Sequence, residues 1–133
     1  CRDKDCRVCP NRKVNCKDRE VVYSIACIEC KDKKGLYIGE TARSVGERFK
    51  EHTELYQSKN KSSCLYKHSL EEHDGQEVKY ELKILAQYPG EPMKRQISEA
   101  EYINTLKPEL NSKDEWANSQ IIRNRSRLLS NLV

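Results

Sequence analysis

The chain has 133 residues, which is enough for one domain of ordinary size with a small appendage. Hydrophobic residues make up 36% of it and charged residues 35%, so its core must be small, and a bound metal is one device that stabilises a small core. The net charge of +4 permits a polyanionic partner without demonstrating one. The sequence contains no apolar run long enough to span a membrane and no signal peptide.

The seven cysteines indicate metal binding rather than a disulfide framework. Their odd number fits complete pairing poorly, and two pairs have CxxC spacing, Cys6 with Cys9 and Cys27 with Cys30. Residues 1–19 have almost no apolar side chain to bury, so they fold only if they are cross-linked. We predict that they form a zinc knuckle in which four thiolates complete a tetrahedral site. The candidate ligands of this zinc ion are Cys1, Cys6, Cys9 and Cys16.

The knuckle is also rich in basic residues, which could contact phosphates. A disordered linker with scattered cysteines is the alternative for this segment. Because the chain begins at Cys1 without an initiator methionine, we expect it to be a domain taken from a longer protein.

The next segment predicts a β-hairpin followed by a helix. Residues 21–28 and 36–40 are β-rich runs, and the sequence between them, residues 31–35, is typical of a turn. A helix is predicted over residues 44–57, opened by a serine that is followed three residues later by a glutamate, as in a capping box.

One face of this helix combines apolar and basic side chains. Its members at helical spacing are Val45, Phe49, His52 and Tyr56. Arg48 lies one turn before His52 and faces the same way, towards the hairpin. On the hairpin, Tyr37 and Gly39 share a strand face, and the glycine leaves room for a close approach. A core needs neither the arginine nor the histidine, so we predict that they converge with the hairpin tyrosines on one functional surface.

A second, shorter helix over residues 64–73 carries two histidines with zinc-finger spacing, His68 and His73. Together with Cys27 and Cys30 they supply the four ligands of a structural zinc site. Cys64, one turn before His68, is a rival ligand. The other alternative is that both histidines are exposed and the two cysteines are buried thiols.

The remaining sequence predicts one strand and two helices. Residues 77–88 alternate between apolar and polar side chains and should form the third strand of the sheet. The helix over residues 92–106 carries Glu99 at the head of an apolar stripe, where a glutamate either extends to solvent or takes part in chemistry. Residues 112–133 form a basic amphipathic tail, which we expect to dock on the sheet, with contact to DNA or a partner as the alternative.

Three motifs resemble those of the GIY-YIG nuclease family. Tyr37-Ile38-Gly39 matches the second motif of the family, and Arg48-x3-His52 matches its helix signature. The first motif is reduced here to Val21-Val22-Tyr23, which keeps the tyrosine. The order Tyr-x-Ile-x-Cys-x2-Cys followed by Tyr-Ile-Gly-x-Thr is similar to that in the endonuclease domain of Penelope-like retroelements. The resemblance extends over residues 20–111.

The resemblance implies a metal-dependent DNA endonuclease domain that nicks one strand. In such a domain Tyr23 takes the proton of the attacking water, Tyr37 positions water or phosphate, and Asn111 supports the site. Glu99 would hold the catalytic Mg²⁺ or Mn²⁺, and it is preferred to Glu101 because it lies twelve residues before Asn111. The full catalytic set is Tyr23, Tyr37, Arg48, His52, Glu99 and Asn111. The expected DNA contacts are Arg12, Lys13, Arg43, Arg48 and Lys50.

General chemistry is consistent with these roles but does not decide which residue acts as the general base. The Arg48 guanidinium can bind non-bridging phosphate oxygens through two hydrogen bonds. A phenol is a poor base until nearby cations lower its pKa, so Tyr23 is preferred and His52 remains the alternative.

We therefore expect an α+β fold, with a three-stranded antiparallel sheet flanked by helices and a zinc site embedded in it. The domains would be a zinc knuckle over 1–19, the endonuclease over 20–111 and the tail over 112–133. By resemblance, the protein would act in the nucleus beside the reverse transcriptase of the same polypeptide and its element RNA. There the nick would prime reverse transcription. The alternatives are a cellular repair or recombination nuclease of the same family and an inactive zinc-dependent nucleic-acid-binding module.

Overall fold

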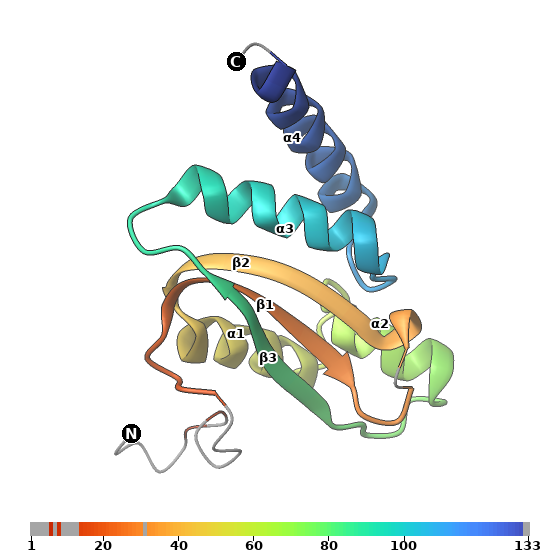
Figure 1. Cartoon of the computed structure of the whole chain (residues 1–133). Helices are drawn as coiled ribbons and strands as arrows, with labels where there is room; N and C mark the ends of the chain where they lie inside the picture. Colours follow the sequence, from red (N-terminus) through yellow and green to blue (C-terminus); the bar gives the residue numbers. More distant parts are fainter. Residues whose placement is uncertain (1–5, 7, 9–13, 31, 132–133) are drawn as a thin grey trace.

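A three-stranded antiparallel sheet forms the middle of the molecule in the computed structural model of the chain, which describes residues 6, 8, 14–30 and 32–131, with side chains up to residue 127 (Figure 1). The strands are β1 (Arg19–Cys27), β2 (Leu36–Ser44) and β3 (Tyr80–Gln87). Their order is β2-β1-β3, and β1 pairs with both neighbours. The predicted sheet is confirmed, with β2 longer than expected and β3 shorter at its start.

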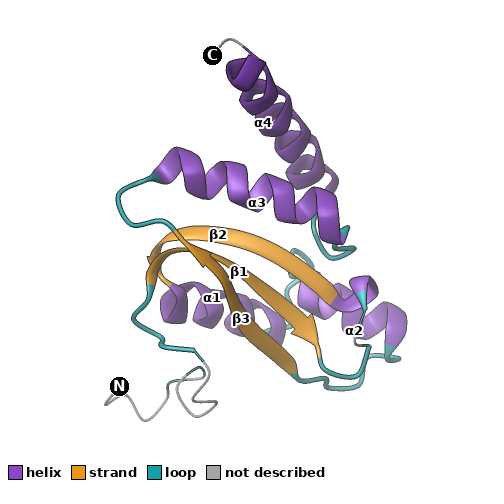
Figure 2. Ribbon diagram, in the orientation of Figure 1, coloured by secondary structure: helices purple, strands orange, loops and turns teal. Residues whose placement is uncertain are grey.

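Helices cover both faces of this sheet, which makes the fold α+β (Figure 2). They are α1 (Val45–Gln57), α2 (Cys64–Glu72), α3 (Pro92–Leu106) and α4 (Lys113–Asn131). A short 3₁₀ turn, η2 (Lys33–Gly35), lies in the β1–β2 connection. The helices α1 and α2 lie on one side of the sheet, and α3 lies on the other side with α4 beyond it. None of the helices, over the residues described, is both long and apolar enough to cross a membrane.

The central strand β1 explains why its sequence is a nearly continuous apolar run. Val21, Tyr23 and Ile25 belong to the core beneath α1 and α2, whereas Val22 belongs to a smaller core with Ile38 and Ile103. A strand that is paired on both edges and covered on both faces must be apolar at successive positions.

Serine side chains begin the first two helices, as the sequence predicted for α1. The Ser44 Oγ accepts a hydrogen bond from the Glu47 backbone N–H at 3.3 Å, and Ser63 does the same for Tyr66 at 3.1 Å. The helix α3 instead begins with Pro92 in its first turn.

The tail helix α4 packs along α3 and not on the sheet as expected. The Arg123 Nε lies 3.0 Å from the Glu101 Oε1, and the Lys107 Nζ lies 5.8 Å from the centre of the Trp116 ring. The tail takes this position because α3 already covers this face of the sheet. Trp116 alone among these residues reaches the smaller core.

The described part of the N-terminal segment is integrated into the main core. Val8 and Val14 are buried there beside Tyr23 and Val45. The Cys16 carbonyl accepts a hydrogen bond of 2.9 Å from the backbone N–H of Gly46, which extends the start of α1. Of the predicted knuckle, Cys1, Cys9, Arg12 and Lys13 lie outside the described residues, so its zinc site stays a prediction.

Candidate active site

Two strand tyrosines and a helix histidine form a cluster of three rings. The ring centres of Tyr23 and Tyr37 are 6.3 Å apart, and that of His52 lies 6.2 Å from Tyr23 and 5.0 Å from Tyr37. Gly39, which pairs with Tyr23 across the strands, makes this possible. A Cβ at Gly39 would lie 2.6 Å from the Tyr23 Oη and 3.0 Å from a Tyr37 ring carbon. The glycine therefore lets the Tyr23 ring cross β2.

The helix α1 presents His52 and Arg48 to this cluster. His52 is buried on the same face as Val45 and Phe49, as predicted. Its Nε2 lies 3.2 Å from the Tyr23 Oη. The Arg48 guanidinium is half-buried, donates to the Glu51 Oε2 at 2.8 Å and acts electrostatically on both tyrosines.

Burial sets the protonation of the Tyr23–His52 pair. It raises the pKa of Tyr23 to about 12, although the charge of Arg48 acts in the opposite direction. Burial lowers the pKa of His52 to about 4, and Arg48 adds to this effect. At neutral pH the phenol is protonated and the imidazole is neutral, so Tyr23 can donate its hydrogen bond to His52.

Glu99 on α3 has carboxylate neighbours. Its pKa is raised to about 7, first by burial and then by the negative charges of Glu40 and Glu115. Arg95 offsets only part of this repulsion, and a hard divalent cation would relieve the rest with oxygen ligands of this kind. The residues at Glu99 therefore fit a divalent metal. Glu101, the other carboxylate considered, is exposed and pairs with Arg123.

Asn111 joins the loop before α4 to the edge strand β2. Its Oδ1 accepts from the Ile38 backbone N–H at 3.0 Å, and its Nδ2 donates to the Ile38 carbonyl at 2.8 Å. The same amide donates to the Glu115 Oε2 at 3.2 Å, and the Tyr37 hydroxyl donates to that oxygen at 3.0 Å. Asn111 thus ties β2 to the Glu115 carboxylate beside Tyr37, and its catalytic role stays a prediction.

A cleft of about 740 Å³ opens over these residues. Its walls include Tyr37, Arg48, His52, Asn111 and Glu115. Tyr23 is only 1% exposed and lies beneath Tyr37 and His52. A bound substrate would therefore meet Arg48, His52 and Tyr37 first.

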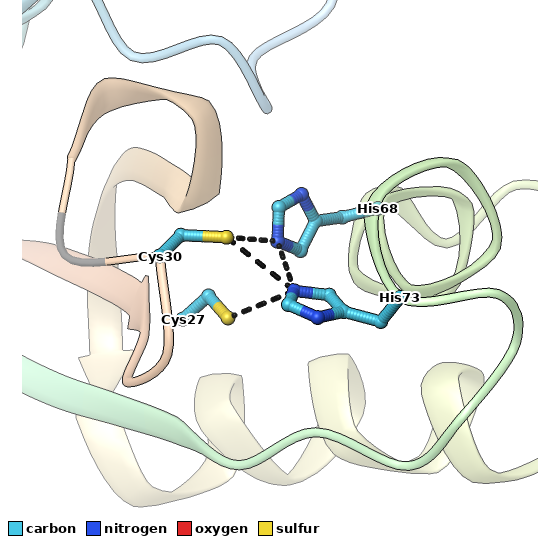
Figure 3. A group of neighbouring side chains, drawn as sticks. All are labelled: Cys27, Cys30, His68 and His73. Atoms are coloured by element: carbon cyan, nitrogen blue, oxygen red, sulfur yellow. Dashed lines mark hydrogen bonds between the residues drawn. The ribbon is translucent and has the colours of Figure 1, made fainter.

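The predicted zinc ligands lie together at one end of the sheet (Figure 3). The Sγ atoms of Cys27 and Cys30 and the Nε2 atoms of His68 and His73 all lie within 4.8 Å of one another. The Cys30 Sγ is 3.3 Å from the His68 Nε2 and 3.4 Å from the His73 Nε2, and the two nitrogens are 3.3 Å apart.

These separations fit a zinc ion. With zinc–sulfur distances of about 2.3 Å and zinc–nitrogen distances of about 2.0 Å, a tetrahedron has S–N edges of about 3.5 Å and an N–N edge of about 3.3 Å. The other ring nitrogen of His73, Nδ1, lies 3.3 Å from the Glu29 Oε2, a typical outer partner of a metal-bound histidine. A Cβ at Gly35 would lie 2.6 Å from the Cys27 Cβ, so the turn can pass the ligands only with glycine there.

The alternatives for the zinc site do not match the structure. His68 is 2% exposed and His73 is half-buried, so the histidines are not a solvated pair. Cys64 is not a member of the four-residue group and instead lines the cleft that contains Tyr37, Arg48 and His52.

Comparison with known proteins agrees with this geometry. The family model of the GIY-YIG catalytic domain matches residues 20–113, most of the chain. The chain belongs to the GIY-YIG family. No curated protein and no solved structure matches it significantly. A GIY-YIG domain is a nuclease-type hydrolase that acts on DNA and uses divalent metals.

The expected DNA contacts on the GIY-YIG domain lie around α1. Arg43 and Lys50 are exposed, and Arg43 and Arg48 share Glu51 as an ion-pair partner. These two arginines, Arg43 first, lower the pKa of Glu51 to about 2. Contact with DNA stays a prediction for all three basic residues.

Sequence reasoning missed three charged residues beside the GIY-YIG site. Glu40 follows directly after the Tyr-Ile-Gly motif and forms an ion pair with Arg95, which is 5% exposed. Arg95 lies one turn before Glu99 on α3, a spacing that could have indicated it. Glu115 belongs to the C-terminal tail, from which no site residue was predicted.

Proposed function

We propose that this GIY-YIG domain is a metal-dependent DNA endonuclease that nicks one strand of a duplex. The observation that carries the proposal is the hydrogen bond between the buried Tyr23 and His52, within reach of the charges of Arg48 and Glu99. Apolar strand packing alone needs neither an ionisable helix pair nor a raised glutamate pKa. Perturbed polar groups of this kind beside a cleft are typical of catalytic sites.

The residues of the chain divide the work of phosphodiester hydrolysis. Arg48 binds non-bridging oxygens of the scissile phosphate and neutralises their charge. Tyr23 takes a proton from the attacking water while its own hydroxyl proton passes to the Nε2 of His52. Burial and then the charge of Arg48 lower the pKa of His52, and the phosphate anion beside Arg48 offsets the second of these effects. Glu99 would hold a divalent cation, Mg²⁺ or Mn²⁺, which would supply charge stabilisation for the leaving oxygen.

This relay treats Tyr23 and His52 as one unit, in which Tyr23 contacts the water and His52 receives the proton. The described residues of one chain form one such site, so the product of one encounter is a single nick. Two chains acting together would be needed to cut both strands.

We further propose that the domain serves a retroelement of the Penelope-like type, in which the nick supplies a 3′-hydroxyl for target-primed reverse transcription. The Cys/His group between β1 and α2 and the order of motifs around it support this assignment. The nucleus would then be its site of action. Its partners would be chromosomal DNA, the element RNA and the reverse transcriptase domain of the same polypeptide.

Cleavage of supercoiled plasmid with Mg²⁺ tests the nuclease. The wild-type chain should convert it to open circle, whereas Glu99→Gln and Tyr23→Phe should not. Glu91→Gln, which changes an exposed acid before α3, and Tyr66→Phe are the matched controls and should cut like wild type. A wild-type chain that shifts the plasmid on a gel without cutting would point to a binding module, and equal cutting by all variants would remove Glu99 and Tyr23 from the site.

Two further observations test the retroelement role. The nicked plasmid should be extended by a DNA polymerase without end repair, because priming requires a free 3′-hydroxyl. The reading frame that contains this chain should also encode a reverse transcriptase. A frame without one would favour a cellular repair or recombination nuclease.

A further inference from the structure

Glu115, in the first turn of α4, makes three hydrogen bonds at the catalytic cleft. Its Oε2 accepts from the Tyr37 hydroxyl at 3.0 Å and from the Asn111 Nδ2 at 3.2 Å. Its Oε1 accepts from the Ser112 backbone N–H at 2.9 Å. The family model ends at residue 113, so this carboxylate lies outside the part of the chain that the family match covers.

The orientation of this carboxylate is determined by how α4 is held. The Ser112 Oγ accepts from the Glu115 backbone N–H at 3.1 Å, which completes a capping box. One residue further on, Trp116 packs against the core that contains Val22 and Ile103. Later in the helix, Arg123 is 9% exposed and pairs with Glu101 of α3 at 3.0 Å. Packing of α4 on α3 therefore holds the carboxylate against Tyr37.

The Tyr37 hydroxyl has a single proton, and that proton is used in the bond to Glu115. Burial, the charge of Tyr23 and the charge of Glu115 raise the pKa of Tyr37, so the phenol keeps this proton. What Tyr37 can offer to a ligand in the cleft is then the lone pairs of its oxygen. A phosphate oxygen is an acceptor and cannot bond to them, whereas a water molecule can donate to them.

We propose that Glu115 is a positioning residue of the nuclease site, which takes the hydrogen bond of the Tyr37 hydroxyl and so makes Tyr37 an acceptor for the attacking water. This inference rests on the proposed endonuclease function. It chooses water over phosphate as the group that Tyr37 positions, and it makes α4 part of the catalytic unit.

A double-mutant cycle tests the proposal. Glu115→Gln should lower kcat by about tenfold or more, with KM changed by less than about twofold. Glutamine has one acceptor oxygen, which cannot serve both the Ser112 N–H and the Tyr37 hydroxyl as the two carboxylate oxygens do, while Arg48 still binds DNA. Tyr37→Phe should have a similar effect. The double variant should be no slower than the slower single variant, because both changes remove the same interaction.

Two control variants separate this role from a loss of helix stability and from charge. Ser119→Ala removes a buried hydroxyl further along α4, which donates to the Trp116 carbonyl, and should lower thermal stability without the loss of kcat. Asp114→Asn removes an exposed acid from the same turn as Glu115 and should cut like wild type. Single-variant losses that multiply in the double variant, or a kcat for Glu115→Gln within about twofold of wild type, would overturn the proposal.

A measurement without DNA keeps this test independent of the proposed function. In ¹⁵N and ¹³C correlation spectra of the zinc-loaded chain, Glu115→Gln should move the Asn111 side-chain amide signals and the Tyr37 ring signals, and Asp114→Asn should not. Unmoved signals would show that the contact does not exist. If the wild-type chain fails to cut plasmid while these signals move, the endonuclease proposal fails and the contact stands.

Discussion

At the scale of single residues, the site contains buried ionisable side chains that packing of the fold does not require. Tyr23 and His52 are buried polar groups that hydrogen-bond to each other, and Glu99 is an acid held beside other acids. Groups of this kind reduce stability in exchange for function, which allows their roles to be tested in the folded protein without substrate.

Replacing Glu99 with glutamine should stabilise the protein at neutral and higher pH when its zinc is retained and no divalent cation is bound at Glu99. The pKa of Glu99 is about 7 in the folded state and has an ordinary value of 4.5. The unfolded chain therefore ionises first, and the wild-type protein loses stability as the pH rises from 4.5 to above 7. Above pH 7 the variant should be more stable by about 1–3 kcal/mol. The difference should vanish below about pH 4.5, where the acid is protonated in both states. Thermal denaturation across this range measures it, and a variant less stable than wild type at high pH would contradict it.

Replacing Gly39 with alanine should disable the site by displacing Tyr23. The new Cβ would lie 2.6 Å from the Tyr23 Oη, so the ring must move away from His52. A misplaced catalytic group should slow cleavage by about 100-fold, and overpacking should cost about 1–3 kcal/mol. Gly46→Ala is the matched control, because its Cβ would lie 2.8 Å from the Cys16 carbonyl and away from the tyrosines. Gly46→Ala should lose stability but keep the wild-type cleavage rate. Equal cleavage rates for Gly39→Ala and Gly46→Ala would count against this role of Gly39.

At the scale of elements, α2 connects the candidate zinc site to the cleft over Tyr37 and His52. His68 belongs to the zinc group and also lines the cleft. Cys64 and Lys67 of the same helix line the cleft without belonging to the zinc group. The sequence predicted the helix and its zinc ligands from spacing alone. That the helix also forms a wall of the cleft depends on how it packs against α1, which spacing does not specify.

Loss of the zinc site should therefore lower both stability and activity. Cys30→Ser and His73→Ala should each reduce the zinc content by one ion per chain and lower the free energy of unfolding, since binding and folding are coupled at a structural site. Metal analysis and thermal denaturation measure the two effects. Cys64→Ser should keep the wild-type zinc content, and a loss of zinc in that variant would restore Cys64 as a ligand.

At the scale of the whole molecule, segments distant in sequence share one core. Val8 and Val14 from the N-terminal segment pack with Tyr23 of β1 and Leu65 of α2. This packing suggests that the predicted knuckle and the endonuclease unfold together rather than as two units.

Val14→Ala tests this cooperativity. It should lower the free energy of unfolding by about 1–3 kcal/mol, from lost burial and the cavity left behind. The transition should remain single, because the valine lies in the core of the endonuclease. Lys17→Ala, which changes an exposed side chain of the same segment, should have little effect. Two separate transitions in the calorimetric trace would show that the segment folds by itself.

Local patterns in the sequence determined most of the elements and the identity of the candidate site. β-Rich runs, alternation and helical spacing predicted three strands and four helices, and the motif residues Tyr37, Arg48 and His52 indicated a nuclease. These features are properties of neighbouring residues, so they can be read along the chain. The same holds for the Cys27-x2-Cys30 and His68-x4-His73 pairs.

Only the tertiary structure decided the contacts between elements far apart in the chain. It placed α4 on α3, brought Glu115 to Tyr37 across 78 positions, and paired Arg95 with Glu40 across 55. It also set the protonation of Tyr23, His52 and Glu99, because burial and neighbouring charges shift a pKa and both are created by folding. Such contacts leave no local period or motif, so the sequence alone could identify the nuclease but not the complete set of groups around its site.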